Sequence, residues 1–193
     1  MSGVGTHSDP GFVKLGEERI YDGYVIGVVD ASFRAPDGTV IHRDVVHHPG
    51  AVTVVPVTAA GEVVLVRQFR SAMETTLLEA PAGKRDVAGE PPEITAVREL
   101  AEEVGLVAGR LEPLMVLAHS PGFCDERNHL FLATDLTETE RAVDGPEEEH
   151  MTIVRLPLVE VFDRIADGSI VDAKTVVGLL LAAQRLGVVA SRG

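Results

Sequence analysis

Apolar residues occur along this chain in two patterns, and each pattern predicts a different kind of element. Continuous runs rich in β-branched residues are typical of buried strands, whereas apolar residues spaced by three or four positions indicate one face of a helix. Turn-forming residues at 35–38 and 59–61 separate the early runs, so residues 51–57 and 63–70 are expected to pair as a hairpin. The pattern predicts strands at 24–33, 40–47, 51–57, 63–70, 111–118, 129–133 and 151–156, and helices at 159–165 and 175–186.

The segment from Gly83 to Leu106, GKRDVAGEPPEITAVRELAEEVGL, predicts a further helix that begins near Pro92 and stops at Gly105. Proline suits the first helical turn, and glycine suits the left-handed position just past the end. The apolar residues of this helix fall on one stripe, which is expected to face the core, and acidic residues fall on the opposite side. The stripe consists of Ile94, Val97, Ala101 and Val104.

Three carboxylates converge on the acidic side of this helix: Glu99, Glu102 and Glu103. Like charges at helical spacing repel by a few tenths of a kcal/mol, and a divalent cation such as Mg²⁺ or Mn²⁺ would offset that repulsion. A solvated helix face would explain the three acids equally well. Arg98 can reach Glu102 at i+4 and hold it, and the turn at residues 79–83 offers backbone carbonyls as further metal ligands.

This segment resembles the signature of the Nudix hydrolases, which cleave nucleoside diphosphates linked to another moiety. The family pattern is Gly, five residues, Glu, seven residues, Arg-Glu, an apolar residue, any residue, Glu-Glu, any residue, Gly and an apolar residue. One departure is visible, because six residues rather than five separate Gly83 from Glu90 in the loop before the helix. The matching positions are Glu90, Arg98, Glu99, Leu100, Glu102, Glu103, Gly105 and Leu106.

A second set of residues resembles the ADP-ribose pyrophosphatase branch of that family. Pro121 follows Leu106 by 15 residues (121 − 106 = 15), an offset that is a mark of this branch. The run Asp125-Glu126-Arg127 lies shortly after the proline, and the runs at 66–70 and 78–83 complete the resemblance. It covers most of the chain, from about residue 12 to residue 180.

The resemblance implies an α/β fold, the Nudix α/β/α sandwich with a mixed sheet, over residues 50–193. Residues 11–49 would form a small N-terminal antiparallel β-sheet, after a flexible tail at residues 1–10. In that branch this sheet packs across a two-fold partner, which implies a homodimer. A hairpin of this size is too small to be stable alone, and docking on its own chain is the alternative to a second subunit.

The resemblance also implies roles for individual residues. The general base is expected in the acidic run at 147–149, where Glu148 is favoured over Glu147. The alternative is that this run is a solvated acidic loop with no catalytic role. Arg70 would grip a phosphate or the ribose, or else pair with nearby acid on the surface. The site residues are Glu148, Glu147 and Glu102 for catalysis, Arg70, Glu126, Glu79 and Arg98 for the substrate, and the Ala82 carbonyl, Glu99, Glu102 and Glu103 for the metal.

Composition and charge narrow the classes of partner. The chain has 193 residues, of which 45% are apolar, and this suffices for the core of one domain. The formal net charge of −13 argues against nucleic acid or an anionic membrane surface as a partner. No apolar run approaches the ~20 residues of a membrane span. The single cysteine, Cys124, suits a reducing compartment, so a cytoplasmic location is expected.

The function expected from these features is Mg²⁺-dependent hydrolysis of the pyrophosphate of ADP-ribose, which gives AMP and ribose 5-phosphate. A Nudix hydrolase of another nucleoside diphosphate sugar, or of a dinucleotide, is the first alternative. A non-catalytic sensor that binds ADP-ribose is the second. Such sensors usually lose helix carboxylates, and all of the carboxylates are present here.

Overall fold

The computed structural model describes residues 11–142 and 149–190, and the chain divides into two compact units. The smaller unit combines the chain up to Gly50 with Ala118–Arg127, and the larger unit contains the rest. The segment Ala118–Arg127 therefore leaves the larger unit between two of its strands. Among the described helices, none has the length and apolarity to cross a membrane.

The smaller unit contains an antiparallel sheet with the strand order β1-β2-β3. Segment Ala118–Arg127 is attached to the last of these strands, because Val46 donates its N–H to the Phe123 carbonyl at 2.7 Å. The first strand was not among those predicted: all ten of its residues are exposed, so no buried face marks it in the sequence. The strands are β1 (Val13–Asp22), β2 (Gly27–Arg34) and β3 (Val40–His47).

The larger unit contains two sheets, of which one is mixed and one antiparallel. The mixed sheet has the order β7-β4-β9-β8, in which β4 and β9 run parallel. The antiparallel sheet has the order β10-β5-β6. The strands are β4 (Ala51–Pro56), β5 (Glu62–Arg70), β6 (Thr75–Glu79), β7 (Ala82–Lys84), β8 (Leu106–Leu117), β9 (Asn128–Glu138) and β10 (Thr152–Pro157).

The expected hairpin of residues 51–57 with 63–70 is wrong as a paired ladder. The turn is present, because Gly61 donates its N–H to the Thr58 carbonyl. The two strands share only the bridge between Val57 and Val63 among the described pairings, and then diverge into the two different sheets. Both runs are apolar on both faces, so the sequence marks them as buried strands without specifying their partners.

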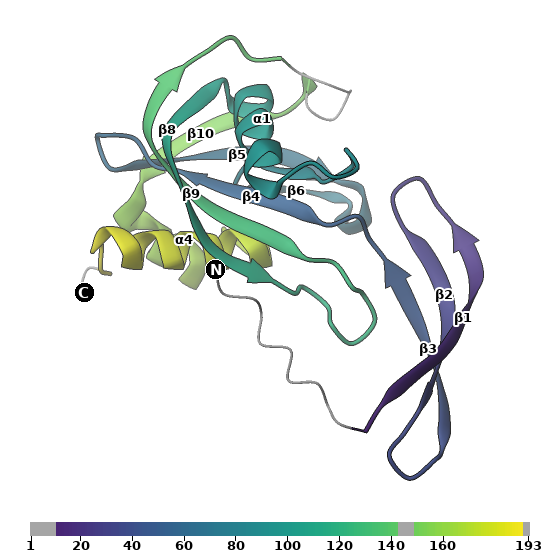
Figure 1. Ribbon diagram of the computed structural model, residues 1–193. Helices are drawn as coiled ribbons and strands as arrows, with labels where there is room; N and C mark the ends of the chain where they lie inside the picture. Colours follow the sequence, from purple (N-terminus) through teal and green to yellow (C-terminus); the bar gives the residue numbers. More distant parts are fainter. Residues whose placement is uncertain (1–10, 143–148, 191–193) are drawn as a thin grey trace. The chain divides into compact units, whose positions relative to one another are not determined.

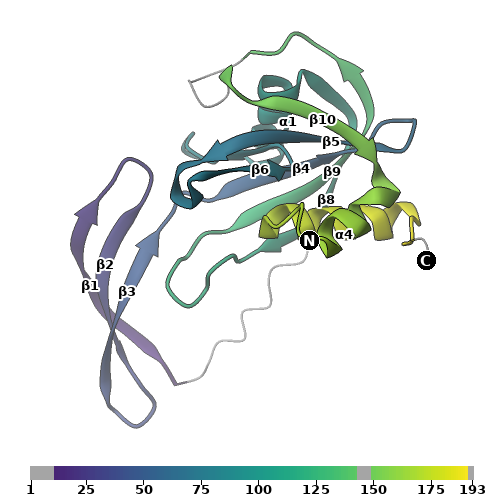
Figure 2. The same ribbon diagram turned by 180° about the vertical axis from the view of Figure 1, so that it is seen from behind.

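Helices α1 (Pro92–Val104) and α4 (Ala173–Leu186) cover opposite sides of the sheets (Figure 1), as the view from behind also shows (Figure 2). Alternate residues of β4 point to the two sides. Val54 packs in a core cluster with residues of α1, and Val55 packs in another with residues of α4. These layers form the predicted α/β/α sandwich. Shorter helical segments are η1 (Ser71–Met73), η2 (Leu158–Glu160) and α3 (Val161–Ala166).

Helix α1 has the predicted bounds, but of the predicted apolar stripe only Val104 is buried. Ile94 and Val97 are 55% and 38% exposed, whereas the buried apolar row consists of Ala96, Leu100 and Val104. This row follows the i, i+4, i+8 ridge of the helix, along which it lies on the sheets. The neighbouring ridge, which carries Glu99 and Glu103, is therefore turned toward the protein and not toward solvent.

Candidate active site

Two carboxylates of α1 lie against the backbone of β7. Glu99 and Glu103 are only 8% and 4% exposed. Glu103 Oε2 accepts a hydrogen bond from the Ala82 N–H at 3.0 Å. A Cβ atom at Gly83 would lie 1.9 Å from the Glu99 carboxyl carbon, so only glycine leaves room for Glu99 there. The helix and the predicted metal-ligand segment are thus in direct contact.

Arg98 links the acidic residues around this contact. Its Nη1 atom lies 3.0 Å from both Glu99 Oε1 and Glu102 Oε2, and its Nη2 lies 3.6 Å from Glu90 Oε2. Burial acts against the charged guanidinium, but the surrounding glutamates outweigh it and raise the pKa of Arg98. Arg98 thus pairs with carboxylates of the site in this structure. Its predicted contact with the substrate stays a prediction.

The longer loop before α1 is closed by a turn. Gly89 has a φ of +78°, and Glu90 donates its N–H to the Val87 carbonyl at 3.1 Å. Glu90 Oε2 in turn accepts the hydroxyl hydrogen of Thr95 at 2.7 Å. The extra residue relative to the family pattern is accommodated before Glu90 and leaves the spacing of the helix carboxylates unchanged.

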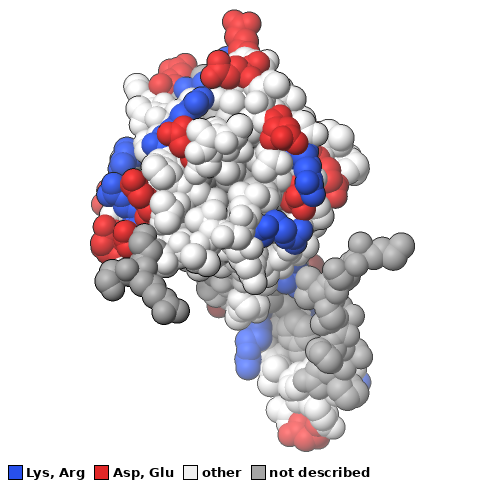
Figure 3. All heavy atoms as spheres, turned by 90° about the vertical axis from the view of Figure 1, so that its left-hand side faces the viewer, with Lys and Arg blue, Asp and Glu red and all other residues white. Residues whose placement is uncertain are grey.

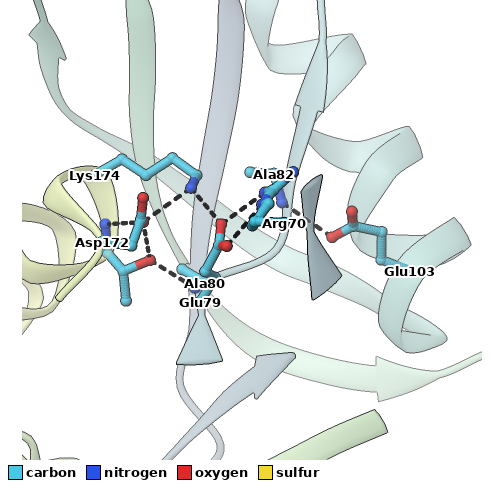
Figure 4. Close-up of polar contacts among 8 residues, drawn as sticks. Arg70, Glu79, Ala80, Ala82, Glu103, Asp172 and Lys174 are labelled. Atoms are coloured by element: carbon cyan, nitrogen blue, oxygen red, sulfur yellow. Dashed lines mark hydrogen bonds and ion pairs between the residues drawn. The ribbon is translucent and has the colours of Figure 1, made fainter. Parts of the chain in front are cut away.

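Beyond β7, four charged side chains form an alternating network in which Glu79 is central (Figure 4). Arg70 donates from Nε and Nη2 to the two Glu79 oxygens, at 2.7 and 2.6 Å. Lys174 Nζ lies 2.5 Å from Glu79 Oε2 and 2.8 Å from Asp172 Oδ2. Burial opposes ionisation of Glu79, but the hydrogen bond from Arg70 and the charges of Lys174 and Arg70 outweigh it, so the pKa of Glu79 is lowered.

The first turn of α4 also holds the backbone after Glu79. Asp172 caps the helix by accepting from the Thr175 N–H at 3.0 Å and from its hydroxyl at 2.6 Å. The same Thr175 hydroxyl oxygen accepts the Ala80 N–H at 2.9 Å. Sequence reasoning missed Asp172, Lys174 and Thr175. An aspartate just before a helical run is a capping signal, but nothing in it indicates a partner 95 residues away.

The predicted metal ligands are brought together by these contacts. Glu99 lies against Gly83, Glu103 is bonded to Ala82, and Glu99 and Glu102 share one guanidinium nitrogen. Within residues 11–142 and 149–190, no three His, Cys, Asp or Glu side chains are already gathered as a metal-holding group. The donors are carboxylate and carbonyl oxygens, which suit a hard divalent cation. The set therefore fits such a cation, which would compete with Arg98 for the carboxylates.

Three predicted site residues do not belong to the described part of the larger unit. Glu148 and Glu147, the predicted general bases, fall outside the described residues. Glu126 belongs to the smaller unit, where its neighbour Asp125 contacts His47 Nδ1 at 2.5 Å. His47 Nε2 lies 3.1 Å from Glu17, so the histidine bridges two carboxylates. The hydrogen bond with Asp125, and then that with Glu17, raises the pKa of His47.

Acidic and basic side chains occur side by side on the face shown in Figure 3, around an uncharged area. No single acidic patch dominates that face, although the formal net charge of the chain is −13. Charges of opposite sign are also interleaved inside the site, where Arg70, Arg98 and Lys174 lie among glutamates and Asp172. The site therefore contains cationic side chains, in a chain whose total charge is negative, but each of them is paired with carboxylates.

The chain is similar to several known proteins. A family model described as "NUDIX domain" matches residues 47–176. The chain is 38% identical over 161 residues to an ADP-ribose pyrophosphatase of Bacillus subtilis (strain 168), covering 83% of this chain and 86% of the relative. It is 39% identical over 169 residues to an ADP-ribose pyrophosphatase of Mycobacterium tuberculosis, covering 88% and 82%. A crystal structure of an ADP compounds hydrolase superposes with a TM-score of 0.80 at 25% identity, covering 92% of this chain and 95% of that one.

Proposed function

Because the chain belongs to the Nudix hydrolase family, we propose that it hydrolyses the pyrophosphate of ADP-ribose to AMP and ribose 5-phosphate, with Mg²⁺ or Mn²⁺ as cofactor. The observation that carries this proposal is the contact of the buried α1 carboxylates with the Ala82–Gly83 backbone. Burying carboxylates of like charge side by side costs free energy unless something compensates them. An oxygen-rich set of this kind is suited to hold a divalent cation beside a diphosphate.

Each ligand would have a support of its own. Glu103 is oriented by the Ala82 N–H, and Arg98 orients Glu99 and Glu102. A divalent cation held there supplies charge neutralisation at phosphorus and activates water. Glu102 is the most accessible of the three carboxylates and is proposed as a metal ligand with a part in catalysis. Glu148, or Glu147 beside it, remains the proposed general base.

Arg70 is proposed to bind the substrate. Two of its nitrogens are used by Glu79, and Nη1 has no hydrogen-bond partner within the described part of the chain. The side chain is about a third exposed, so one donor of a fixed guanidinium remains available to a phosphate or ribose oxygen. Glu126 is proposed to contact the terminal ribose, as the family resemblance implies.

We also propose that the enzyme is a homodimer formed through the N-terminal sheet. All ten residues of β1 are exposed, and several of them are large and apolar. An exposed apolar edge strand favours pairing with another chain, and a second copy would bury it. The apolar residues are Val13, Leu15, Ile20 and Tyr21. Size-exclusion chromatography with light scattering should give the mass of two chains; a monomer would contradict this proposal.

A substrate panel tests the reaction. The purified protein is assayed with Mg²⁺ against ADP-ribose, other nucleoside diphosphate sugars and dinucleotides, and products are separated by chromatography. We expect ADP-ribose to have the highest kcat/KM and excess chelator to abolish turnover. Faster turnover of another nucleoside diphosphate sugar would replace ADP-ribose as the substrate. Tight binding of ADP-ribose without cleavage would instead indicate a sensor.

A further inference from the structure

Lys174 is a buried cation that the proposed reaction does not require. It belongs to the first turn of α4, and its residue is only 8% exposed. Its Nζ contacts two carboxylate oxygens, on Glu79 at 2.5 Å and on Asp172 at 2.8 Å. A lysine is rarely buried unless its charge is paired, so these contacts are the reason it can lie there.

The network around Lys174 has no net charge. Two cations, Arg70 and Lys174, alternate with two anions, Glu79 and Asp172 (Figure 4). The causes that lower the pKa values of Glu79 and Asp172 agree with this pairing. Although burial favours the neutral carboxyls, the hydrogen bonds and charges of Arg70 and Lys174 hold the pKa of Glu79 low, and Lys174 with Thr175 does the same for Asp172. The two cations therefore favour the ionised form of both carboxylates, and the contacts hold the four side chains in place.

Glu79 connects Lys174 to the proposed substrate residue. Glu79 Oε2 accepts from both Lys174 Nζ and Arg70 Nη2, whereas Glu79 Oε1 accepts from Arg70 Nε. Rotation of the Glu79 carboxylate would break this bidentate pair. Lys174 opposes that rotation because it is itself held from the other side by Asp172. The guanidinium orientation of Arg70 thus depends on a residue that does not reach the substrate.

We propose that Lys174 is a positioning residue that fixes Glu79 and thereby presents Arg70 Nη1 to the substrate. This rests on the proposed function only in taking Arg70 as a substrate contact. A fixed guanidinium loses less freedom when the substrate binds, so Lys174 contributes to substrate affinity. It does so from α4, which otherwise packs as a covering helix.

The metal-ligand segment is also held by contacts that do not include the Lys174 side chain. Ala80 is bonded to the Thr175 hydroxyl, and the Pro81 carbonyl accepts the Val54 N–H at 2.8 Å. Ala82 pairs with Thr53 of β4 and donates to Glu103. Loss of the Lys174 charge should accordingly change KM, with little effect on kcat or on the metal concentration required.

The test compares Lys174→Met, Lys174→Arg and the matched control Arg185→Met. Arg185 belongs to the last turn of α4 and forms an exposed ion pair with Glu112, remote in sequence from the network. We expect Lys174→Met to raise KM roughly 10-fold with kcat within about 2-fold. Lys174→Arg should restore most of the loss, and Arg185→Met should behave as wild type. An unchanged KM in Lys174→Met, or a fall in kcat alone, would overturn the proposal.

A second measurement does not depend on turnover. In a ¹H–¹⁵N spectrum of the arginine side chains, the Arg70 Nε–H should exchange slowly with water in the wild type, and rapidly in Lys174→Met. Slow exchange in both would also overturn the proposal. If Lys174→Met does not fold, Lys174→Gln, which keeps a hydrogen-bond donor, carries the same two measurements. If the wild type prefers another nucleoside diphosphate, the ADP-ribose assignment fails, while the Lys174 effect is read on that substrate.

Discussion

The contact between Gly83 and Glu99 gives the sharpest test of the metal site, through the substitution Gly83→Ala. An added Cβ would lie 1.9 Å from the Glu99 carboxyl carbon and 2.1 and 2.3 Å from its oxygens. Ordinary carbon contacts begin near ~3.5 Å, so the carboxylate has to retreat by about 1.5 Å. Gly83 is not among the glycines with positive φ, so alanine is compatible with its backbone and the steric effect acts alone.

The expected effect is large for catalysis and moderate for stability. A displacement of about 1 Å in a reacting geometry costs on the order of 10²-fold in rate, so kcat should fall by about that factor. The apparent Mg²⁺ activation constant should rise, because Glu99 is proposed as a ligand. Overpacking costs about 1–3 kcal/mol. For a chain of this size, that lowers the melting temperature by roughly 2–12 °C, which leaves a folded protein at assay temperature.

Gly109→Ala is the matched control. A Cβ at this position on β8 would lie 2.8 Å from the Asp135 carbonyl oxygen, so it introduces a clash with backbone, away from the carboxylates of α1. It should lower the melting temperature without changing the Mg²⁺ dependence of the folded enzyme. The assay is steady-state turnover over a Mg²⁺ titration, with thermal unfolding of each variant. Wild-type kcat and Mg²⁺ dependence in Gly83→Ala would refute a role for Glu99 as a metal ligand in this position.

Three further predictions concern charge. Glu103→Gln should lower kcat at least 10²-fold and weaken Mg²⁺ binding in calorimetry, whereas Glu93→Gln, on the exposed first turn of α1, should do neither. Glu79→Gln should destabilise the fold by about 3 kcal/mol at pH 7, because it removes the carboxylate partner of Arg70 and one of the two carboxylate partners of the buried Lys174. The pKa of Glu79 is lowered in the folded state. Its contribution to the free energy of unfolding is therefore present above the ordinary pKa of 4.5 and is lost as pH falls through the lowered pKa. Denaturant unfolding of the wild type and of Glu79→Gln at a series of pH values checks this. The raised pKa of His47 gives the opposite dependence of stability on pH. Its stabilising contribution is full below the ordinary pKa of 6.5 and is lost as pH rises through the folded-state pKa. NMR titration of the His47 ring and unfolding of His47→Gln would measure this.

The acidic helix was the most predictable part of the molecule. Its bounds follow from local signals at its two ends, a proline in the first turn and a glycine with φ of +64° just past Val104. The spacing of Glu99, Glu102 and Glu103 is likewise a local property of the helix. What the spacing does not contain is the direction in which the helix faces. Ile94 and Val97 indicate one side by hydrophobicity, and the helix turns the carboxylate side toward the protein instead.

Partners distant in sequence account for what could not be predicted. The strands at residues 51–57 and 63–70 are recognisable as strands, but their separation into two sheets depends on β9 and β10, which follow much later in the chain. The same holds for the site. Arg70 and Glu79 were identified as site residues, whereas Lys174 reaches Glu79 across 95 residues of sequence. Only the fold brings α4 to that position.

The passage of Ala118–Arg127 into the smaller unit means that no single cut separates the two parts of this protein. A shortened chain that begins at Ala51 would still carry this excursion, now deprived of the Val46 amide and carbonyl that engage Phe123 and Asp125. Conversely, the first 50 residues expressed alone would lack Ala118–Arg127, the other segment of the smaller unit. Domain-exchange or grafting experiments on this enzyme should therefore treat the N-terminal sheet and the segment between β8 and β9 as one unit, and should transfer or retain both together.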